Sequence, residues 1–267
     1  VDYEQGLLAV SDLGDTQLIG CLNDDNVLAW YGKAIALLPR LGSVALELEP
    51  FDEAFMAREN AIFPEWLLGH HLQLTLSAEE QGLLAETFAC LTESNLAQPQ
   101  GVMHRDFHSR NLMVCGGDTP DDSQRAVIDC QDMVIGPLSY DLVSLLKDCY
   151  VRWPDAVIEQ GMGHGFDTLS QAGLLGDLDY AAFRRYADLT GMQRHLKAAG
   201  LFTRLYHRDG KSGYLKDIPR TLGYVVDVCH QHGAEHPVLA RFGDWLQRIV
   251  LPGLARAAEA RRAGEPS

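Results

Sequence analysis

The chain has 267 residues, of which 46% are hydrophobic, so it can bury the core of one large domain or of two small ones. Its 37 acidic residues outnumber the 22 basic ones and give a formal net charge of -15. This balance argues against nucleic acid and anionic membranes as partners, because both bind clusters of basic residues. It is compatible with a nucleotide ligand, since Mg²⁺ bridges phosphates to carboxylates.

The predicted elements begin with a strand at 7–10 and a helix over 23–41, where apolar residues recur at helical spacing. Pro64 interrupts the next helical pattern. Ser77 and Glu80 then fit a capping box that opens a helix ending near residue 95.

The middle of the chain is the part that favours strands. Strands are predicted at 102–104, 112–115 and 126–129, and a polar loop over 116–124 makes the last two a hairpin. Beyond Pro137 the pattern is helical, and the predicted helices cover 140–150, 156–172, 179–205, 221–232 and 238–262. The predicted fold class is therefore α+β and mostly helical, with a small β insert.

The six cysteines are scattered without a C-x-x-C pair, and most lie in apolar segments. Such usage predicts reduced, largely buried thiols. The sequence contains no run of about 18 apolar residues. These features predict a cytoplasmic protein.

Three polar residues beside the predicted strands carry the strongest functional signal. Asp106 follows the first strand, Asn111 opens the second, and Asp129 ends the third. Phosphoryl transfer from a nucleotide needs a carboxylate that orients and deprotonates the acceptor hydroxyl, and an Asn and an Asp that hold Mg²⁺. We therefore predict Asp106 as the base and Asn111 and Asp129 as metal ligands. Stabilisation of turns is the alternative role for Asp106 and Asn111.

The alternation of His104, Asp106 and His108 also invites interpretation as a zinc site. A functional zinc site needs a third or fourth ligand and groups that orient the ligands, and the sequence shows no further cluster with that spacing. His104 is therefore predicted to be a packed histidine that braces the loop. Asp132 either supports the metal ligand or caps the following turn. Asp141 either begins a helix as an acid favoured by the dipole or hydrogen-bonds back to the catalytic loop.

A resemblance to a known family rests on three motifs: His104-x-Asp106-x-x-x-x-Asn111, Ile128-Asp129 and Gly136-Pro137-x-x-Tyr140-Asp141. They resemble the aminoglycoside phosphotransferase and choline kinase family, a branch of the protein kinase-like fold. The resemblance implies ATP and Mg²⁺ as cofactors, with Asp106 as base and Asp141 as a brace of the loop. His108, where protein kinases usually have Lys, favours a small-molecule acceptor and joins the predicted catalytic set.

Further segments look like the N-acetylmuramate/N-acetylglucosamine anomeric kinases of bacterial peptidoglycan recycling. These segments are Phe63-Pro64-Glu65-Trp66, Ile135-Gly136-Pro137-Leu138-Ser139-Tyr140-Asp141-Leu142, Met192-Gln193-Arg194-His195-Leu196-Lys197 and His207-Arg208-Asp209-Gly210-Lys211. This resemblance implies ATP-dependent phosphorylation of the anomeric hydroxyl of an amino sugar, which gives an α-1-phosphate.

Candidate substrate residues follow from the same segments. Gln193, Arg194 and Lys197 fall in one predicted helix and Arg208 in a polar loop, a basic patch suited to the carboxylate of a muramic acid or to nucleotide phosphates. Solvated charges are the alternative. The predicted substrate residues are Arg110, Asp132, Glu65, Gln193, Arg194, Lys197 and Arg208.

The family also has a β lobe before the helical lobe, with a phosphate-covering loop and a strand Lys. No glycine-rich loop precedes Asp106, and Lys33, the only lysine upstream of it, lies in a helical pattern. The resemblance implies that residues 1–14 form the last strand and hinge of a largely absent N-terminal lobe, and residues 15–267 the helical C-terminal lobe.

Backbone atoms of Ala9, Val10 and Ser11 would meet adenine in that hinge. The predicted partner is a small-molecule amino sugar, with neither nucleic acid nor membrane. Phosphorylation of an aminoglycoside or another small alcohol is one alternative function, and a non-catalytic fragment or pseudokinase is another.

Overall fold

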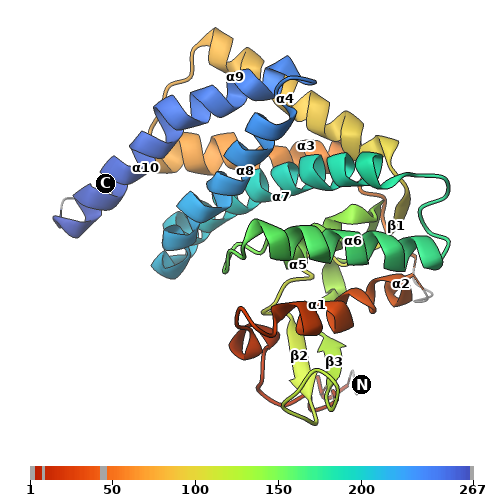
Figure 1. Cartoon of the computed structure of the whole chain (residues 1–267). Coiled ribbons are helices and arrows are strands. Elements are labelled where there is room, and N and C mark those ends of the chain that lie inside the picture. Colours follow the sequence, from red (N-terminus) through yellow and green to blue (C-terminus); the bar gives the residue numbers. More distant parts are fainter. Residues whose placement is uncertain (1–3, 8–9, 43–46, 265–267) are drawn as a thin grey trace.

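Helices make up most of the molecule, and short strands surround the segment that carries Asp106 and Asn111. The computed structural model describes residues 4–7, 10–42 and 47–264 (Figure 1). The predicted mostly helical α+β fold class is confirmed. The predicted strand at 7–10 falls partly outside these ranges, and Ala9 is not among the described residues.

The N-terminal segment contains a 3-10 helix, η1 (Leu18–Cys21), and two short helices, α1 (Val27–Ile35) and α2 (Leu38–Leu41). The predicted single helix over 23–41 is therefore wrong. Pro39 lies in the first turn of α2 and has no N–H to donate to a preceding carbonyl, so the first helix ends before it.

The next helices are α3 (Glu53–Asn60), the π-helix η2 (Phe63–His71) and α4 (Ala78–Ala97). The predicted capping box is confirmed, because the Ser77 N–H donates to Glu80 Oε2 at 2.8 Å and the Glu80 N–H donates to Ser77 Oγ at 3.3 Å. Pro64 interrupts the helical pattern at the first turn of η2.

Two antiparallel strand pairs follow. Strand β1 (Gln100–Met103) pairs with β4 (Val134–Pro137), and β2 (Leu112–Cys115) pairs with β3 (Gln124–Val127). The predicted hairpin is confirmed, although its second strand begins two residues earlier than expected. A 3-10 turn, η3 (Cys130–Asp132), joins β3 to β4. The segments that carry Asp106, Asn111 and Asp129 are thus held between the two strand pairs.

The C-terminal half is helical, as predicted. Its elements are α5 (Ser139–Leu146), α6 (Asp155–Gln171), α7 (Tyr180–Asp209), η4 (Ser212–Asp217), α8 (Ile218–His232), α9 (Pro237–Trp245), the π-helix η5 (Leu246–Val250) and α10 (Leu251–Arg262). Helix α7 runs beyond its predicted end, so Arg208 lies on this helix and not in a loop. Gly210, at φ 69°, ends the helix in the left-handed conformation.

Helix α7 connects two hydrophobic cores. Its residues Met192 and Leu196 belong to the core shared with η2, α8 and α9, whereas Phe183 and Ala187 belong to the core shared with α1, α5 and α6. In Figure 1 the helices α4, α8 and α9, which contribute to the first core, lie in the upper part of the molecule, and the β2–β3 hairpin lies at the lower end. Phe107, fully buried in the second core, anchors the loop that carries Asp106.

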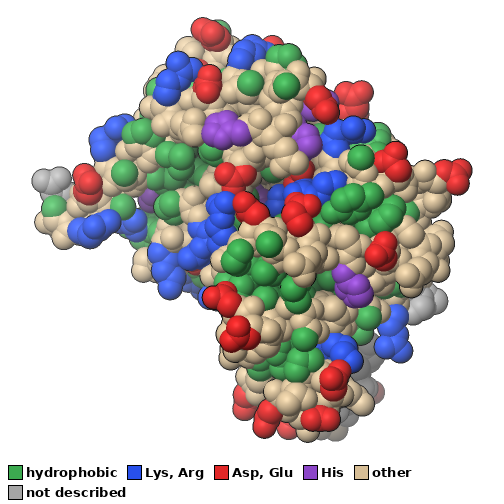
Figure 2. All heavy atoms as spheres, viewed as in Figure 1, with side chains coloured by type: hydrophobic (Ala, Val, Ile, Leu, Met, Phe, Trp, Pro, Cys, Tyr) green, Lys and Arg blue, Asp and Glu red, His purple; other side chains and the backbone are tan. Residues whose placement is uncertain are grey.

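Basic and acidic side chains gather across the middle of the face shown in Figure 2. All six cysteines are free, but only Cys149 and Cys229 are buried and Cys130 is exposed, so the expectation of largely buried thiols is wrong. Within the described ranges, no helix is both long and apolar enough to cross a membrane.

Candidate active site

The loop between β1 and β2 begins with a turn that a buried acid holds. The carboxyl group of Asp141, in the first turn of α5, accepts hydrogen bonds from the backbone N–H groups of His104 at 2.7 Å and Arg105 at 3.0 Å. Of the two predicted roles, Asp141 thus hydrogen-bonds back to the loop. Burial raises the pKa of Asp141 to about 7. The two backbone bonds fix the turn that presents Asp106.

The same loop brings the three candidate catalytic residues together. Nδ2 of Asn111 donates to the backbone carbonyl of Asp106 at 3.1 Å and lies 3.5 Å from Oδ2 of Asp129. Asp129 has a left-handed backbone with φ 69°, and its Oδ1 accepts a 2.7 Å hydrogen bond from Gln131. Left-handed geometry is tolerated by Asp and directs the chain into η3 directly after β3.

This arrangement fits a magnesium ion. Mg²⁺ prefers oxygen ligands and usually takes one or two carboxylates from the protein, with phosphate oxygens and water completing its octahedron. Asp129 supplies an exposed carboxylate, and Asn111, whose Nδ2 lies 3.5 Å from Oδ2 of Asp129, would supply its amide oxygen. Both groups face the loop that holds Asp106, where phosphates would be required for transfer.

The far end of the loop is held by Asp148. Its Oδ2 accepts hydrogen bonds from the backbone N–H of Ser109, at 3.1 Å, and from the Ser109 hydroxyl, while its Oδ1 accepts from the Tyr150 N–H at 2.9 Å. The Tyr150 ring packs under the loop, with the Arg110 guanidinium 3.6 Å from its centroid and the His108 ring edge-on at 5.4 Å. Burial lowers the pKa of His108.

A cavity of about 70 Å³ adjoins Asp106. Its wall includes Arg105, His108, Tyr150, Arg194 and Lys197. The catalytic loop, the chain after α5 and the middle of α7 therefore meet at one cavity.

The cavity wall contains three cationic side chains, those of Arg105, Arg194 and Lys197, and few anionic side chains lie close enough to neutralise them. Glu59 on α3 contacts Arg105 at 2.5 Å and Lys197 at 2.7 Å, so one carboxylate serves two cations. Burial favours a raised pKa for Glu59, but Lys197 and Arg105 outweigh it and hold the pKa below its ordinary value. Gln193 is fully buried and donates to Asn60 Oδ1 at 3.2 Å, so it lies behind this cluster.

Other predicted residues lie elsewhere. Glu65 is exposed on η2, and Arg208 pairs with its neighbour Asp209 about 16 Å along α7 from Lys197. Val10 and Ser11 are exposed near the start of the described chain. None of these four lines the cavity. Asp132 is exposed too, and only its backbone carbonyl contacts the cavity wall, through a 3.2 Å bond from Arg105.

The zinc interpretation finds no support in the geometry. Among the described residues, no group of three or more His, Cys, Asp and Glu side chains is placed to hold a metal ion. His104 is fully buried and packs edge-on against Phe107 at 6.2 Å. The role of His104 as a brace of the loop stays a prediction.

Sequence reasoning missed Glu59, Asp148 and Tyr150. Glu59 contacts Arg105 of the loop because α3 packs beside α7, and no local sequence pattern predicts that contact between distant segments. Asp148 carried a usable signal, because it follows α5 directly and lies seven residues after Asp141.

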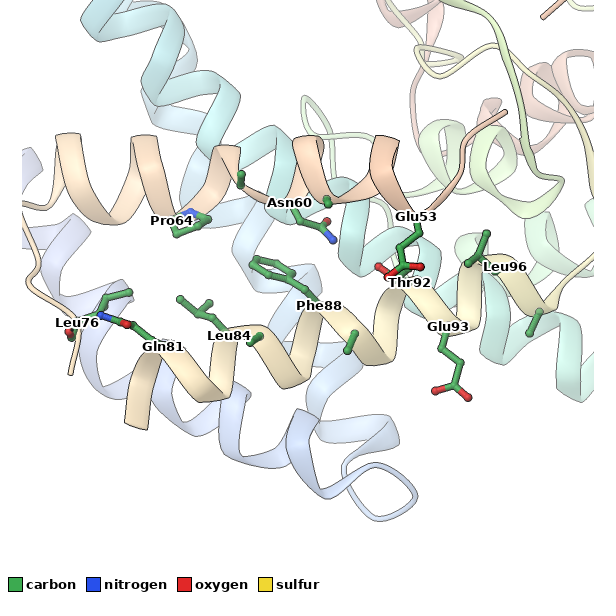
Figure 3. Close-up of a pocket in the computed structure, with 15 residues that line it drawn as sticks. Glu53, Asn60, Pro64, Leu76, Gln81, Leu84, Phe88, Thr92, Glu93 and Leu96 are labelled. Carbon is green, nitrogen blue, oxygen red and sulfur yellow. Dashed lines mark hydrogen bonds between the residues drawn. The ribbon is translucent and has the colours of Figure 1, made fainter. Parts of the chain in front are cut away.

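A larger, apolar groove of about 890 Å³ lies on the other side of α3 (Figure 3). Pro64 and Asn60 line it from η2 and α3, and Leu84 and Phe88 project toward them from α4. Glu59 therefore contacts Arg105 and Lys197 of the cavity wall, while the adjacent Asn60 lines this groove.

A helical lobe with a catalytic loop that carries Asp106 and Asn111 beside Asp129 defines the class of kinase-like phosphotransferases. A solved ethanolamine kinase from Plasmodium vivax shares the fold, with a TM-score of 0.54, 12% identity and coverage of 81% of this chain and 62% of that one. The chain belongs to the phosphotransferase enzyme family (APH), whose model matches residues 2–186.

Curated relatives are more similar in sequence. An N-acetylmuramate/N-acetylglucosamine kinase of Pseudomonas putida is 36% identical over 250 residues, which cover 93% of this chain and 71% of that protein. A protein with the same name from Neisseria meningitidis is 36% identical over 245 residues, covering 90% and 72%.

Proposed function

We propose that the protein transfers the γ-phosphoryl group of ATP to the anomeric hydroxyl of N-acetylmuramate or N-acetylglucosamine. One observation carries the chemistry: Asp106 lies on a loop fixed at both ends, with the Asn111 amide 3.5 Å from the Asp129 carboxylate. The names of the curated relatives support the choice of sugar.

In this proposal Asp106 accepts the proton of the acceptor hydroxyl as that oxygen attacks phosphorus. General-base assistance of this kind contributes roughly 10²–10⁴-fold to the rate. Asn111 and Asp129 hold Mg²⁺, which when bound neutralises charge on the phosphates. Asp141 and Asp148 keep Asp106 in place through their bonds to the loop backbone, so little reorganisation accompanies the transfer.

The proposed adenine contact uses the backbone of Ala9, Val10 and Ser11, of which the structure describes Val10 and Ser11. The segment that follows them runs along β2: the Val114 N–H donates to Thr16 at 2.9 Å, and the Ile19 N–H donates to Ser109 at 3.0 Å. These bonds fasten residues 16–19 to β2 and to the catalytic loop. They support placing the chain from residue 15 onward in the helical lobe (15–267), and the hinge role of residues 1–14 is part of the proposal.

Phosphorus NMR of the product tests the function. With ATP, Mg²⁺ and N-acetylmuramate, we expect a sugar phosphate whose phosphorus couples to the proton on C1. A phosphate found only on an aminoglycoside hydroxyl in parallel incubations would contradict the choice of substrate. No phosphorylated product with any of these acceptors would contradict the kinase function itself.

A further inference from the structure

A guanidinium group without a carboxylate partner lies in the wall of the Asp106 cavity. Arg194 on α7 is only 6% exposed, and its Nη1 donates to the thiol of Cys149 at 3.5 Å. A thiol is a weak acceptor. Among the ion pairs of the described residues, none includes Arg194. Burying such a charge without a partner is costly, so the site favours an anion supplied from outside.

The neighbouring acids leave this charge uncompensated. Glu59 is already shared by Arg105 and Lys197. Both carboxyl oxygens of Asp148 accept bonds from Ser109 and Tyr150, so Asp148 attracts Arg194 only at longer range. Asp141 is occupied by two backbone N–H groups. Asp106 is the remaining anionic side chain of the wall. The three cations Arg105, Arg194 and Lys197 therefore share two carboxylates, those of Asp106 and Glu59.

The size of the cavity limits what enters. A water molecule takes about 30 Å³ in the liquid. The cavity of about 70 Å³ therefore has room for a group of a few heavy atoms, such as a carboxylate. A ring at the mouth would present one hydroxyl to Asp106 while a substituent reaches Arg194.

Resting on the proposed sugar kinase function, we infer that Arg194 binds the carboxylate of the lactyl ether of N-acetylmuramate and so favours the acidic sugar over N-acetylglucosamine. The two sugars differ in this lactyl group alone. A guanidinium binds a carboxylate through two parallel N–H···O bonds, which a small enclosed site can orient. Arg194 thereby acts as a specificity residue of the same site.

The first experiment removes the charge from the sugar and leaves the protein intact. The purified protein is assayed with saturating ATP and Mg²⁺ on N-acetylmuramate and on its neutral carboxamide. We expect kcat/KM for the carboxamide to be about 10–100-fold lower, the loss typical of a hydrogen bond to a charged group. Equal values would overturn the role of Arg194. Phosphorylation of neither N-acetylmuramate nor N-acetylglucosamine would instead contradict the proposed function.

The second experiment removes the charge from the protein. Arg194→Gln should lower kcat/KM for N-acetylmuramate about 10–100-fold more than it lowers kcat/KM for N-acetylglucosamine, and it should abolish the preference for the acid over the carboxamide. Retained N-acetylglucosamine turnover also shows that the variant folds. Arg241→Gln, which removes an exposed arginine paired with Glu86, is the matched control and should change neither ratio. An equal loss of kcat/KM with both sugars would assign Arg194 to the transferred phosphoryl group and overturn the inference. If the variant does not fold, the comparison of N-acetylmuramate with its carboxamide decides.

Discussion

A carboxyl oxygen of Asp141 accepts a 3.0 Å hydrogen bond from the backbone N–H of Arg105, a residue whose φ is +74°. A left-handed backbone at a residue other than Gly costs about 1–3 kcal/mol and persists only where its surroundings impose it. The bonds from Asp141 to Arg105 and to His104 impose it here. The strained turn directly precedes Asp106, so Asp141 positions the proposed base without touching the substrate.

Asp141 should make stability depend on pH. The unfolded carboxyl group ionises above its ordinary pKa of 3.8, whereas burial keeps the folded group protonated up to about 7. The free energy of unfolding should therefore fall by roughly 4 kcal/mol as pH rises from about 4 to about 7 because of this group. Urea unfolding across this range should show a weaker pH dependence in Asp141→Asn than in the wild type. Parallel curves for the two proteins would refute the assignment.

Removing the shared carboxylate of Glu59 should destabilise the fold. Glu59→Gln leaves Arg105 and Lys197 largely buried without their counter-ion, for which we expect a loss of about 3 kcal/mol. Glu86→Gln is the matched control, because the Glu86–Arg241 pair is exposed and should contribute less than about 1 kcal/mol. Denaturant unfolding measures both. Similar losses of unfolding free energy in the two variants would contradict the claim that the buried Glu59 pairs stabilise the fold more than an exposed pair does.

Asp129 should govern the magnesium requirement. Asp129→Asn removes the exposed carboxylate beside Asn111, and the Mg²⁺ concentration for half-maximal activity should rise at least about tenfold. Activity titrated with Mg²⁺, with EDTA as the starting condition, gives this value. Asp24→Asn, which changes an exposed acid far from Asp129 in the sequence, should leave the titration unchanged. An unaltered requirement in Asp129→Asn would exclude Asp129 as a ligand.

Gly200 should be essential where α7 packs on η2. A Cβ at this position would lie 2.5 Å from the carbonyl oxygen of Ile62 and 2.8 Å from the backbone nitrogen of Phe63, so Gly200→Ala should cost about 1–3 kcal/mol. Gly163→Ala on α6 meets nothing within 4 Å and should stabilise the protein by about 0.5–1 kcal/mol. Thermal unfolding of both variants checks the opposite signs. Stabilisation by Gly200→Ala would contradict the close contact.

Local signals in the sequence predicted the elements that local chemistry determines. The Ser77–Glu80 capping box marked the start of α4, and the polar loop marked the β2–β3 hairpin, because both depend on residues within a few positions of one another. Arg208 was misplaced because the polar sequence around it resembles a loop, whereas Gly210 supplies the actual end of α7.

The cavity wall was less predictable, because packing between distant helices builds it. The sequence predicts one basic patch of Gln193, Arg194 and Lys197. In the structure, however, Gln193 and Lys197 contact α3, whereas Arg194 contacts Cys149 in the chain after α5. Gln193 bonds to Asn60 and Lys197 pairs with Glu59, whereas Arg194 has no carboxylate partner among the described residues. These differences depend on contacts across about 45 to 138 residues of sequence, beyond the reach of periodicity.

The turnover number of Asp106→Asn with N-acetylmuramate tests the central claim most directly. Among the described residues, the hydrogen bonds of Asp106 use its backbone carbonyl, so its side chain is free to act on substrate and its replacement should leave Tm nearly unchanged. We predict that kcat falls roughly 10²–10⁴-fold in this folded variant, the contribution of a general base. An unchanged kcat in a folded Asp106→Asn protein would contradict the account.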